Sequence, residues 1–320
     1  MSTHLSQTID IINDNARYDT SVKEVLADKQ VLARILKYSL AEFENDEIED
    51  IMKSMDTPVI SKVRMEPGQT NLNKVEKTSE EDNVPGEGKI FYDIRFSVFR
   101  GEEQIKFLIN IEAQKSSDEN KLGYQLDNRI IYYLGRMISS QKEVEFTKSN
   151  YNDLKHVRSI WICMDSGDEE DSINRICLSQ ETVYGKEMEL CNLDKVVGVI
   201  IRLRKNENAA ESRNILIAML EELLRKDAAD KKKQKLEQYG LVMDDETRRR
   251  LDVMCNLSEV VMEKGIEQGV KQGIEQGIEQ GEARLNNLNK LLMEQKRIDD
   301  LQKAIADEEY RSQLYEEFNL

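Results

Sequence analysis

Two adjacent segments of alternating residues constrain the fold of this chain most strongly. Apolar side chains occupy every second position in "IFYDIRFSVF", residues 90–99, and again in "QIKFLINIEAQK", residues 104–115. Alternation over this length is typical of β-strands with one buried face. The polar turn "RGEE" between them is short enough to join antiparallel neighbours. The sequence therefore predicts a β-hairpin near the middle of the chain.

The polar face of this hairpin carries two carboxylates. Residues i and i+2 of a strand share a face, so Glu112 and Gln114 project together. A four-residue "RGEE" turn sets Asp93 opposite Asn110 and diagonal to Glu112, whereas a two-residue turn sets Asp93 opposite Glu112. Either register leaves about 5–8 Å between the Cβ atoms of the two acids. Without a cation the two like charges would repel each other.

Two carboxylates with waters are a ligand set that suits Mg²⁺, for which Mn²⁺ is a substitute. A solvated hairpin face without any ligand also alternates Asp, Arg, Asn and Glu, so the pattern alone leaves both interpretations open.

The flanking segments predict an α/β fold. The nearly continuous apolar run "VRSIWICMD" is typical of a strand covered on both faces. Helical spacing appears before and after the hairpin. We expect a mixed sheet flanked by helices, with a core order of helix, strand, strand, strand, helix, strand and a helical C-terminal extension. The predicted segments are a helix at 19–43, a strand at 58–65, the hairpin, a helix at 118–140, strands at 157–165, 174–185 and 195–204, and helices from 206 onward.

The C-terminal part has a different character. Glycine recurs every fourth residue from Gly265 to Gly281, and an imperfect heptad-like leucine stripe follows. Each glycine inside a helix costs about 1 kcal/mol relative to alanine. A solvated helical spacer and a coiled-coil-like helix for homo-oligomerisation both fit this pattern. The expected organisation is a folded domain at 1–205, a helical extension at 206–261 and a tail at 262–320.

Composition excludes several classes of function. There are 62 acidic and 46 basic residues, and the formal net charge of −16 opposes general adhesion to nucleic acid. Any nucleic-acid site must therefore be local or compensated by a metal. Two histidines cannot supply a multi-histidine metal site. The four cysteines are widely spaced, which predicts reduced thiols. We find no signal peptide and no apolar run of about 18 residues, so we expect a cytoplasmic protein without a membrane span.

The residues of the hairpin and its neighbours resemble the PD-(D/E)XK nuclease superfamily. The similar segments are "IFYDIRF" with Asp93, "INIEAQK" with Glu112, Ala113 and Gln114, the helix "YQLDNRIIYYLGRMISSQ" and the strand "SIWICMD". Within that superfamily the chain resembles the recombination-promoting nucleases often labelled putative transposases. The resemblance covers about residues 18–204, and glycine-spaced C-terminal extensions occur in the same branch.

This resemblance implies a restriction-endonuclease-like sheet and a metal held by Asp93, Glu112 and the backbone carbonyl of Ala113. Gln114 stands where the superfamily usually has lysine. A lysine could polarise the attacking water, whereas Gln114 can only orient it through hydrogen bonds. The implied function is a Mg²⁺-dependent DNA endonuclease, with Asp93, Glu112 and Gln114 as its catalytic residues.

Further candidates lie on two helices. Arg129 and Arg136 are expected on a polar stripe where they contact DNA phosphates, with Tyr132 and Tyr133 beside them. Pairing of these arginines with surface acids is the alternative. Asp19 is a further candidate, although capping of the first helix also explains it. The alternative function is an inactive nuclease fold that serves as an oligomeric DNA- or protein-binding module. A three-carboxylate transposase is disfavoured because no third acid has a comparable setting.

Overall fold

The computed structural model describes residues 16–60, 81–84, 88–91, 93–101, 103–204, 210–224 and 229–320. The chain divides into two compact units, Met1–Glu259 and Val260–Leu320, which are treated separately. Residues 61–65 of the expected strand at 58–65 lie outside the described residues.

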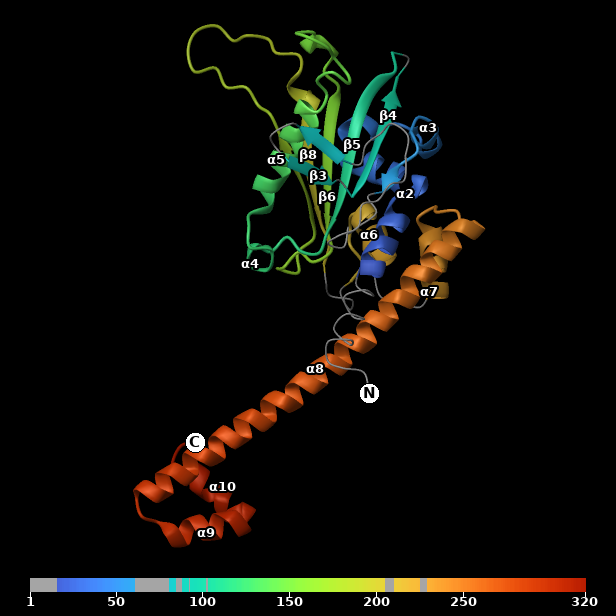
Figure 1. Cartoon of the computed structure of the whole chain (residues 1–320). Helices are drawn as coiled ribbons and strands as arrows, with labels where there is room; N and C mark the ends of the chain where they lie inside the picture. Colours follow the sequence, from blue (N-terminus) through green and yellow to red (C-terminus); the bar gives the residue numbers. More distant parts are fainter. Residues whose placement is uncertain are drawn as a thin grey trace. The chain divides into compact units, whose positions relative to one another are not determined.

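The first unit is built on a six-stranded mixed sheet in the order β1-β4-β5-β6-β8-β7 (Figure 1). β5, β6 and β8 are mutually parallel, and the other neighbours are antiparallel. The expected α/β class with a mixed sheet is confirmed. The strands are β1 (Val59–Ile60), β4 (Ile94–Arg100), β5 (Ile105–Gln114), β6 (His156–Cys163), β7 (Ser172–Cys177) and β8 (Val196–Arg202). A separate pair consists of β2 (Glu81–Val84) and β3 (Gly88–Phe91).

One face of the sheet is covered by several helices. Residues 16–26 are helical, and α2 (Lys29–Ser39) follows after a break at Asp28. The predicted single helix at 19–43 is therefore wrong, because the Asp28 carboxylate accepts the backbone N–H of Gln30 and caps a new helix. The remaining helices near this face are α3 (Ile48–Lys53), α6 (Ile215–Leu224), α7 (Ala229–Gln238) and the start of α8 (Asp245–Glu294), with a 3-10 turn at Ala41–Phe43.

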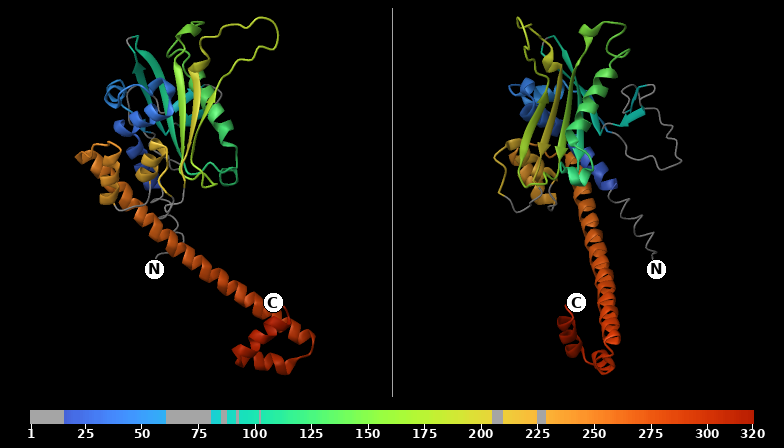
Figure 2. Two further views of the ribbon diagram at one scale, coloured as in Figure 1. Left: turned by 180° about the vertical axis from the view of Figure 1, so that it is seen from behind. Right: turned by 90° about the vertical axis from the view of Figure 1, so that its left-hand side faces the viewer.

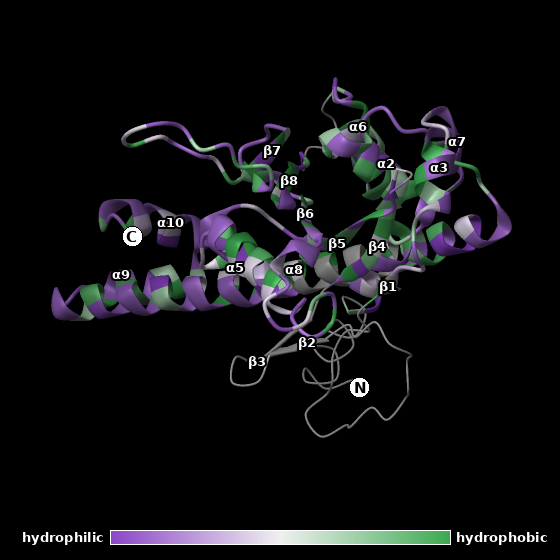
Figure 3. Cartoon of the chain, turned by 90° about the horizontal axis from the view of Figure 1, so that it is seen from above, coloured by the Kyte–Doolittle hydropathy of each residue, from purple (hydrophilic) through white to green (hydrophobic). Residues whose placement is uncertain are grey.

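The opposite face is covered by α5 (Leu126–Ser139), which lies across the sheet from α2 and α6 (Figure 2). The helix carries hydrophobic and hydrophilic residues in alternating patches (Figure 3). Its buried side chains pack on Val157 and Trp161 of β6. The approach is close at Gly198 of β8, where an added Cβ would lie 2.9 Å from the Ile130 Cγ2 atom. A short helix, α4 (Glu119–Leu122), precedes α5, and 3-10 turns lie at Tyr151–Asp153 and Leu193–Lys195.

The expected domain limit at residue 205 is wrong. Leu216 and Leu220 of α6, Leu236 of α7, and Leu251 and Met254 of α8 all belong to the main core beside the sheet. The first compact unit continues to Glu259. The segment at 206–261 therefore completes the core rather than extending from it.

The strand expected at 174–185 is also shorter than predicted. β7 ends at Cys177, and the following residues take no regular structure up to Asn192. Val183 and Tyr184 in this segment are 91% and 98% exposed, so no packing holds them in a strand. All four cysteines are free, with Cys163 and Cys255 buried and the other two exposed.

The second unit consists of the C-terminal part of α8 with α9 (Ile298–Ala306) and α10 (Glu308–Glu317). Leu288, Leu292, Ala304 and Leu314 form its small buried core. The glycine repeat is helical, and its apolar positions are exposed. Ile266, Val270, Ile274 and Ile278 are each 57–59% exposed. Across the described parts of the chain, none of the helices combines the length and the apolar composition that crossing a bilayer requires.

Candidate functional site

The hairpin register places the two predicted acids opposite each other. β4 and β5 pair Ile94 with Ile111 and Arg100 with Ile105, so the next pair along the same register is Asp93 and Glu112. This is the second of the two expected registers, reached with a four-residue turn rather than the two-residue turn assumed for it. Gly101 and Gln104 take positive φ values of 72° and 53°, which lets the longer turn close.

The two acids hold each other through backbone amides. The Asp93 N–H donates to Glu112 Oε1 at 3.1 Å, and the Ala113 N–H donates to Asp93 Oδ2 at 3.0 Å. We call Asp93 and Glu112 the carboxylate pair. Glu112 is 3% exposed, whereas the Asp93 side chain is 19% exposed. The pair is therefore rigidly placed, with Asp93 nearer to solvent.

A lysine from the first helix completes this cluster. Lys23 Nζ lies 2.8 Å from Asp93 Oδ1 and 3.0 Å from Asp19 Oδ2. The expected repulsion between bare carboxylates is thus relieved by a resident cation. Asp19 lies inside the helix at 16–26, so its expected role as an N-cap is wrong, and its contact with Lys23 joins it to the site.

Sequence reasoning missed Lys23. The available signal was the i, i+4 spacing of Asp19 and Lys23, which is also the spacing of ordinary surface ion pairs on helices. The distinguishing feature is burial, because Lys23 is only 5% exposed.

Burial and charge shift the ionisation of the site. Burial of Glu112, with the neighbouring charge of Asp93 second, raises the pKa of Glu112 to about 8. Burial alone would lower the pKa of Lys23, but the charges and hydrogen bonds of Asp93 and Asp19 outweigh it, and the pKa is raised. Lys23 is therefore held as a cation, while Glu112 without a metal holds a proton at neutral pH.

Arg129 of α5 connects Gln114 to a group of aromatic side chains. Its guanidinium donates to Gln114 Oε1 at 3.3 Å, to the Tyr124 hydroxyl at 2.6 Å and to the Tyr133 hydroxyl at 3.2 Å. It also lies 5.1 Å from the centroid of the Trp161 ring. Gln114, predicted as catalytic, and Arg129 and Tyr133, predicted as DNA contacts, are thus brought together, and Tyr124 joins them.

The other residues predicted on α5 lie in different environments. Arg136 is 2% exposed, so its expected position on an exposed polar stripe is wrong. Tyr133 is 8% exposed, and its hydroxyl meets Arg129 rather than solvent. Tyr132 is 52% exposed and is available to a ligand. Tyr132 and Tyr133 differ in exposure because consecutive residues of a helix point about 100° away from each other.

A buried polar chain lies beneath the carboxylate pair. Asn110 precedes Glu112 on the same face of β5 and is completely buried. Its amide donates to Ser159 Oγ at 3.3 Å, and Trp161 Nε1 donates to the same oxygen at 2.8 Å. These bonds fix the floor of the site, and the sequence indicated none of them because Ser159 and Trp161 lie on another strand.

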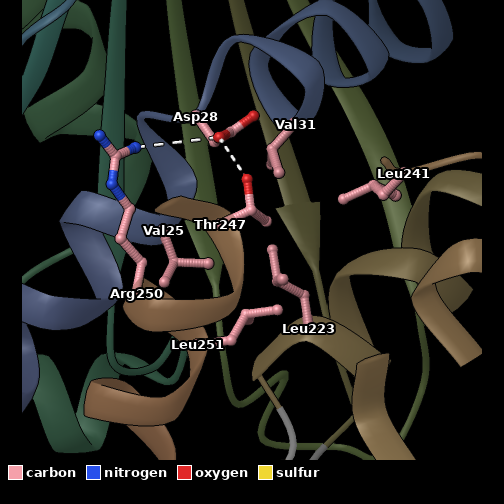
Figure 4. Close-up of a pocket in the computed structure, with 8 residues that line it drawn as sticks. All are labelled: Val25, Asp28, Val31, Leu223, Leu241, Thr247, Arg250 and Leu251. Atoms are coloured by element: carbon pink, nitrogen blue, oxygen red, sulfur yellow. Dashed lines mark hydrogen bonds and ion pairs between the residues drawn. The ribbon is translucent and has the colours of Figure 1, made fainter. Parts of the chain in front are cut away.

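A small pocket elsewhere in the first unit is structural. It is lined by Val25, Asp28, Val31, Leu223, Leu241, Thr247, Arg250 and Leu251 (Figure 4). Thr247 Oγ1 donates to Asp28 Oδ2 at 3.4 Å, and Arg250 Nη1 lies 3.8 Å from the same carboxylate oxygen. These contacts seat the start of α8 at the break before α2, and the pocket shares no residue with the carboxylate pair.

The carboxylate pair is the candidate set of metal ligands in this site. No group of three or more His, Cys, Asp or Glu side chains arranged for a metal occurs within the described ranges. Mg²⁺ needs fewer protein ligands, because it is commonly held by one or two carboxylates together with waters and substrate phosphates. Two carboxylates are within this range, and metal binding by the carboxylate pair and the Ala113 carbonyl stays a prediction.

We compared the chain with known proteins. No protein-family model, curated protein or solved structure matches it.

Proposed function

We propose that this protein is a metal-dependent DNA endonuclease of the PD-(D/E)XK type, similar to the recombination-promoting nucleases. The observation that carries the proposal is the carboxylate pair, fixed at the end of a hairpin, with Lys23 paired to Asp93 and Arg129 bonded to the nearby Gln114. Paired acids beside cations suit the hydrolysis of a phosphodiester, because the acids bind a metal and the cations face the phosphate.

Each residue has a distinct role in this proposal. Asp93, Glu112 and the Ala113 carbonyl would hold Mg²⁺ or Mn²⁺. When bound, the ion would lower the pKa of a water and neutralise charge on the scissile phosphate. The Gln114 oxygen already accepts from Arg129, so its NH₂ group is the part that can orient a water or a phosphate oxygen by donation. The restriction-endonuclease-like arrangement of the sheet belongs to the same proposal.

The DNA contacts follow from exposure. Tyr132 and Tyr124 are 52% and 38% exposed and offer rings or hydroxyls to the backbone of a nucleic acid. Arg129 lies beside Tyr124 and supplies the positive charge. Arg136 is buried, and we assign it no contact with DNA.

Plasmid nicking tests the proposal. Purified protein is incubated with supercoiled plasmid in Mg²⁺, Mn²⁺ or EDTA, beside Glu112→Gln and Asp93→Asn variants. Asp50→Asn is the matched control, because the Asp50 side chain is 70% exposed on α3. We expect metal-dependent nicking by the parent and the control, with a loss of about 100-fold or more in the two site variants. Nicking that persists in EDTA or in Glu112→Gln would overturn the proposal.

The second candidate is an oligomeric binding module, and the exposed row of Ile266, Val270, Ile274 and Ile278 favours it. Isolated exposed apolar residues are ordinary, but a regular row along one helix is a surface for self-association. Sedimentation of the full chain against a chain ending at Glu259 tests this role. Loss of self-association on truncation, together with no nicking by the full chain, would leave the binding module as the function.

A further inference from the structure

We propose that Lys23 is a phosphate-binding residue of this site, which supplies from the first helix the ammonium that Gln114 cannot supply from β5. The ligand group is a non-bridging oxygen of the DNA phosphodiester. This inference rests on the proposed nuclease function and deepens it.

The position of Lys23 is unusual for a helical lysine. Lysines are almost never fully buried unless they are paired, and i, i+4 pairs on helices normally lie in solvent. Lys23 is 5% exposed and reaches across to the end of the hairpin, where it meets Asp93 at 2.8 Å. Lys23 is thus a buried cation that pairs with Asp93, the same carboxylate that we assign to the metal.

The hydrogen-bonding capacity of Lys23 leaves room for a ligand. An ammonium group has three donors. Among the described residues, the ion pairs with Asp19 and Asp93 account for two of them. The third is the one that we assign to a phosphate oxygen. The Asp93 side chain beside it is 19% exposed, and we place the phosphate oxygen at this opening.

The net charge of the site gives a second reason to assign phosphate binding to Lys23. With Glu112 protonated, Asp19 and Asp93 contribute −2, and Lys23 and Arg129 contribute +2, for a total of 0 before a metal binds. Without Lys23 the total is −1. A phosphodiester is itself an anion, so removing Lys23 increases repulsion of the substrate. Gln114 has no charge with which to compensate.

A purely structural ion pair is the competing explanation. In that case Lys23 would only neutralise Asp93. Replacing both Asp19 and Lys23 would then leave the nicking rate unchanged. The test must therefore separate folding, metal binding and catalysis.

The experiment compares Lys23→Met and the double variant Asp19→Asn/Lys23→Met with the parent. The double variant removes the acid that Lys23 neutralises on its own helix, which protects the fold if the single variant fails. Lys53→Met is the matched control, since the Lys53 side chain is 76% exposed on α3. Calorimetric titration with Mn²⁺ reports metal binding, and plasmid nicking reports the reaction.

We expect the double variant to melt cooperatively and to bind Mn²⁺ as tightly as the parent or more tightly, because a competing cation is gone from Asp93. Its nicking rate should fall by about 100-fold or more, the effect of losing one donor to a developing anion. Lys23→Arg should recover part of the rate. Nicking by the double variant at the parent's rate overturns the role of Lys23 and leaves the nuclease standing. A parent that nicks no plasmid overturns both, so the two failures are distinct.

Discussion

On the face of the sheet that packs against α2 and α6, β5 presents Phe107, Ile109 and Ile111, all completely or almost completely buried. On the face under α5 the same strand presents Leu108, then Asn110 and Glu112. Both faces of β5 are buried, but the first carries only apolar side chains of this strand. The second carries Asn110, whose amide donates to Ser159 Oγ, and Glu112, which accepts the Asp93 N–H.

The difference shows where stability and chemistry come from. Apolar burial contributes about 25 cal/mol per Å², and the first face gathers most of it. A buried carboxylate costs free energy unless it is protonated, paired or bound to a cation. The chain can keep Glu112 under α5 because the opposite face of the same strands is so well packed.

The largest expected effect comes from removing part of the apolar face. A chain of residues 1–205 loses α6, α7 and the start of α8, and with them the residues that cover that side of the core. Whole domains are stable by only about 5–15 kcal/mol, so we expect no cooperative thermal unfolding from this fragment. A chain ending at Glu259 is the control and should unfold cooperatively in calorimetry. Cooperative unfolding of both fragments would show that α6 and α7 are dispensable.

A single substitution on the apolar face should have the next largest effect. Ile109→Ala creates a cavity at a completely buried position, and we expect a loss of about 2–5 kcal/mol in the free energy of unfolding by urea. Ile105→Ala, at a position 42% exposed on the same strand, should change the free energy by less than about 0.5 kcal/mol. Equal losses at the two positions would contradict the assignment of the core.

Burial of Glu112 on the polar face should make the free energy of unfolding depend on pH. The pKa of Glu112 is raised from 4.5 to about 8 in the folded protein, so folding favours the protonated acid. Its contribution to stability is full below about pH 4.5 and is lost as the pH rises toward 8. Glu112→Gln should therefore match the parent at pH 4.5 and exceed it at pH 8 by a few kcal/mol at most, since one pKa unit equals about 1.4 kcal/mol.

Urea unfolding in EDTA at several pH values measures this difference. Glu103→Gln, an exposed acid in the hairpin turn, is the control and should track the parent throughout. A Glu112→Gln variant that tracks the parent as well would mean that Glu112 is ionised in the folded protein at neutral pH.

The smallest effect tests whether the polar face is also closely packed. Gly198→Ala places a Cβ 2.9 Å from the Ile130 Cγ2 atom, which forces α5 to shift. Overpacking costs about 1–3 kcal/mol, and the stiffer alanine returns about 0.4–1 kcal/mol through the unfolded state. We expect a net loss of about 1 kcal/mol in urea unfolding. A gain in stability would indicate that α5 packs loosely.

The sequence predicted the class of fold and the acids on one hairpin face, because both follow from the period of two along a strand. It could not choose the register, since two turn lengths fitted the same residues. Lys23 was invisible because its partner Asp93 is distant in the sequence. The boundary at 205 is wrong because it leaves α6, "ILIAMLEELL", outside the domain, although a helix so rich in apolar residues must be buried.

The reciprocal amide bonds between Asp93, Glu112 and Ala113 have a consequence for folding. Sliding one strand by a single residue would turn every side chain of the hairpin to the opposite face. The two bonds form only when Asp93 stands opposite Glu112, so a slipped hairpin would leave both acids without these donors. Asp93 and Glu112 therefore also help to select the register in which β4 pairs with β5. Replacing both by alanine would remove this contribution while the apolar face stays unchanged.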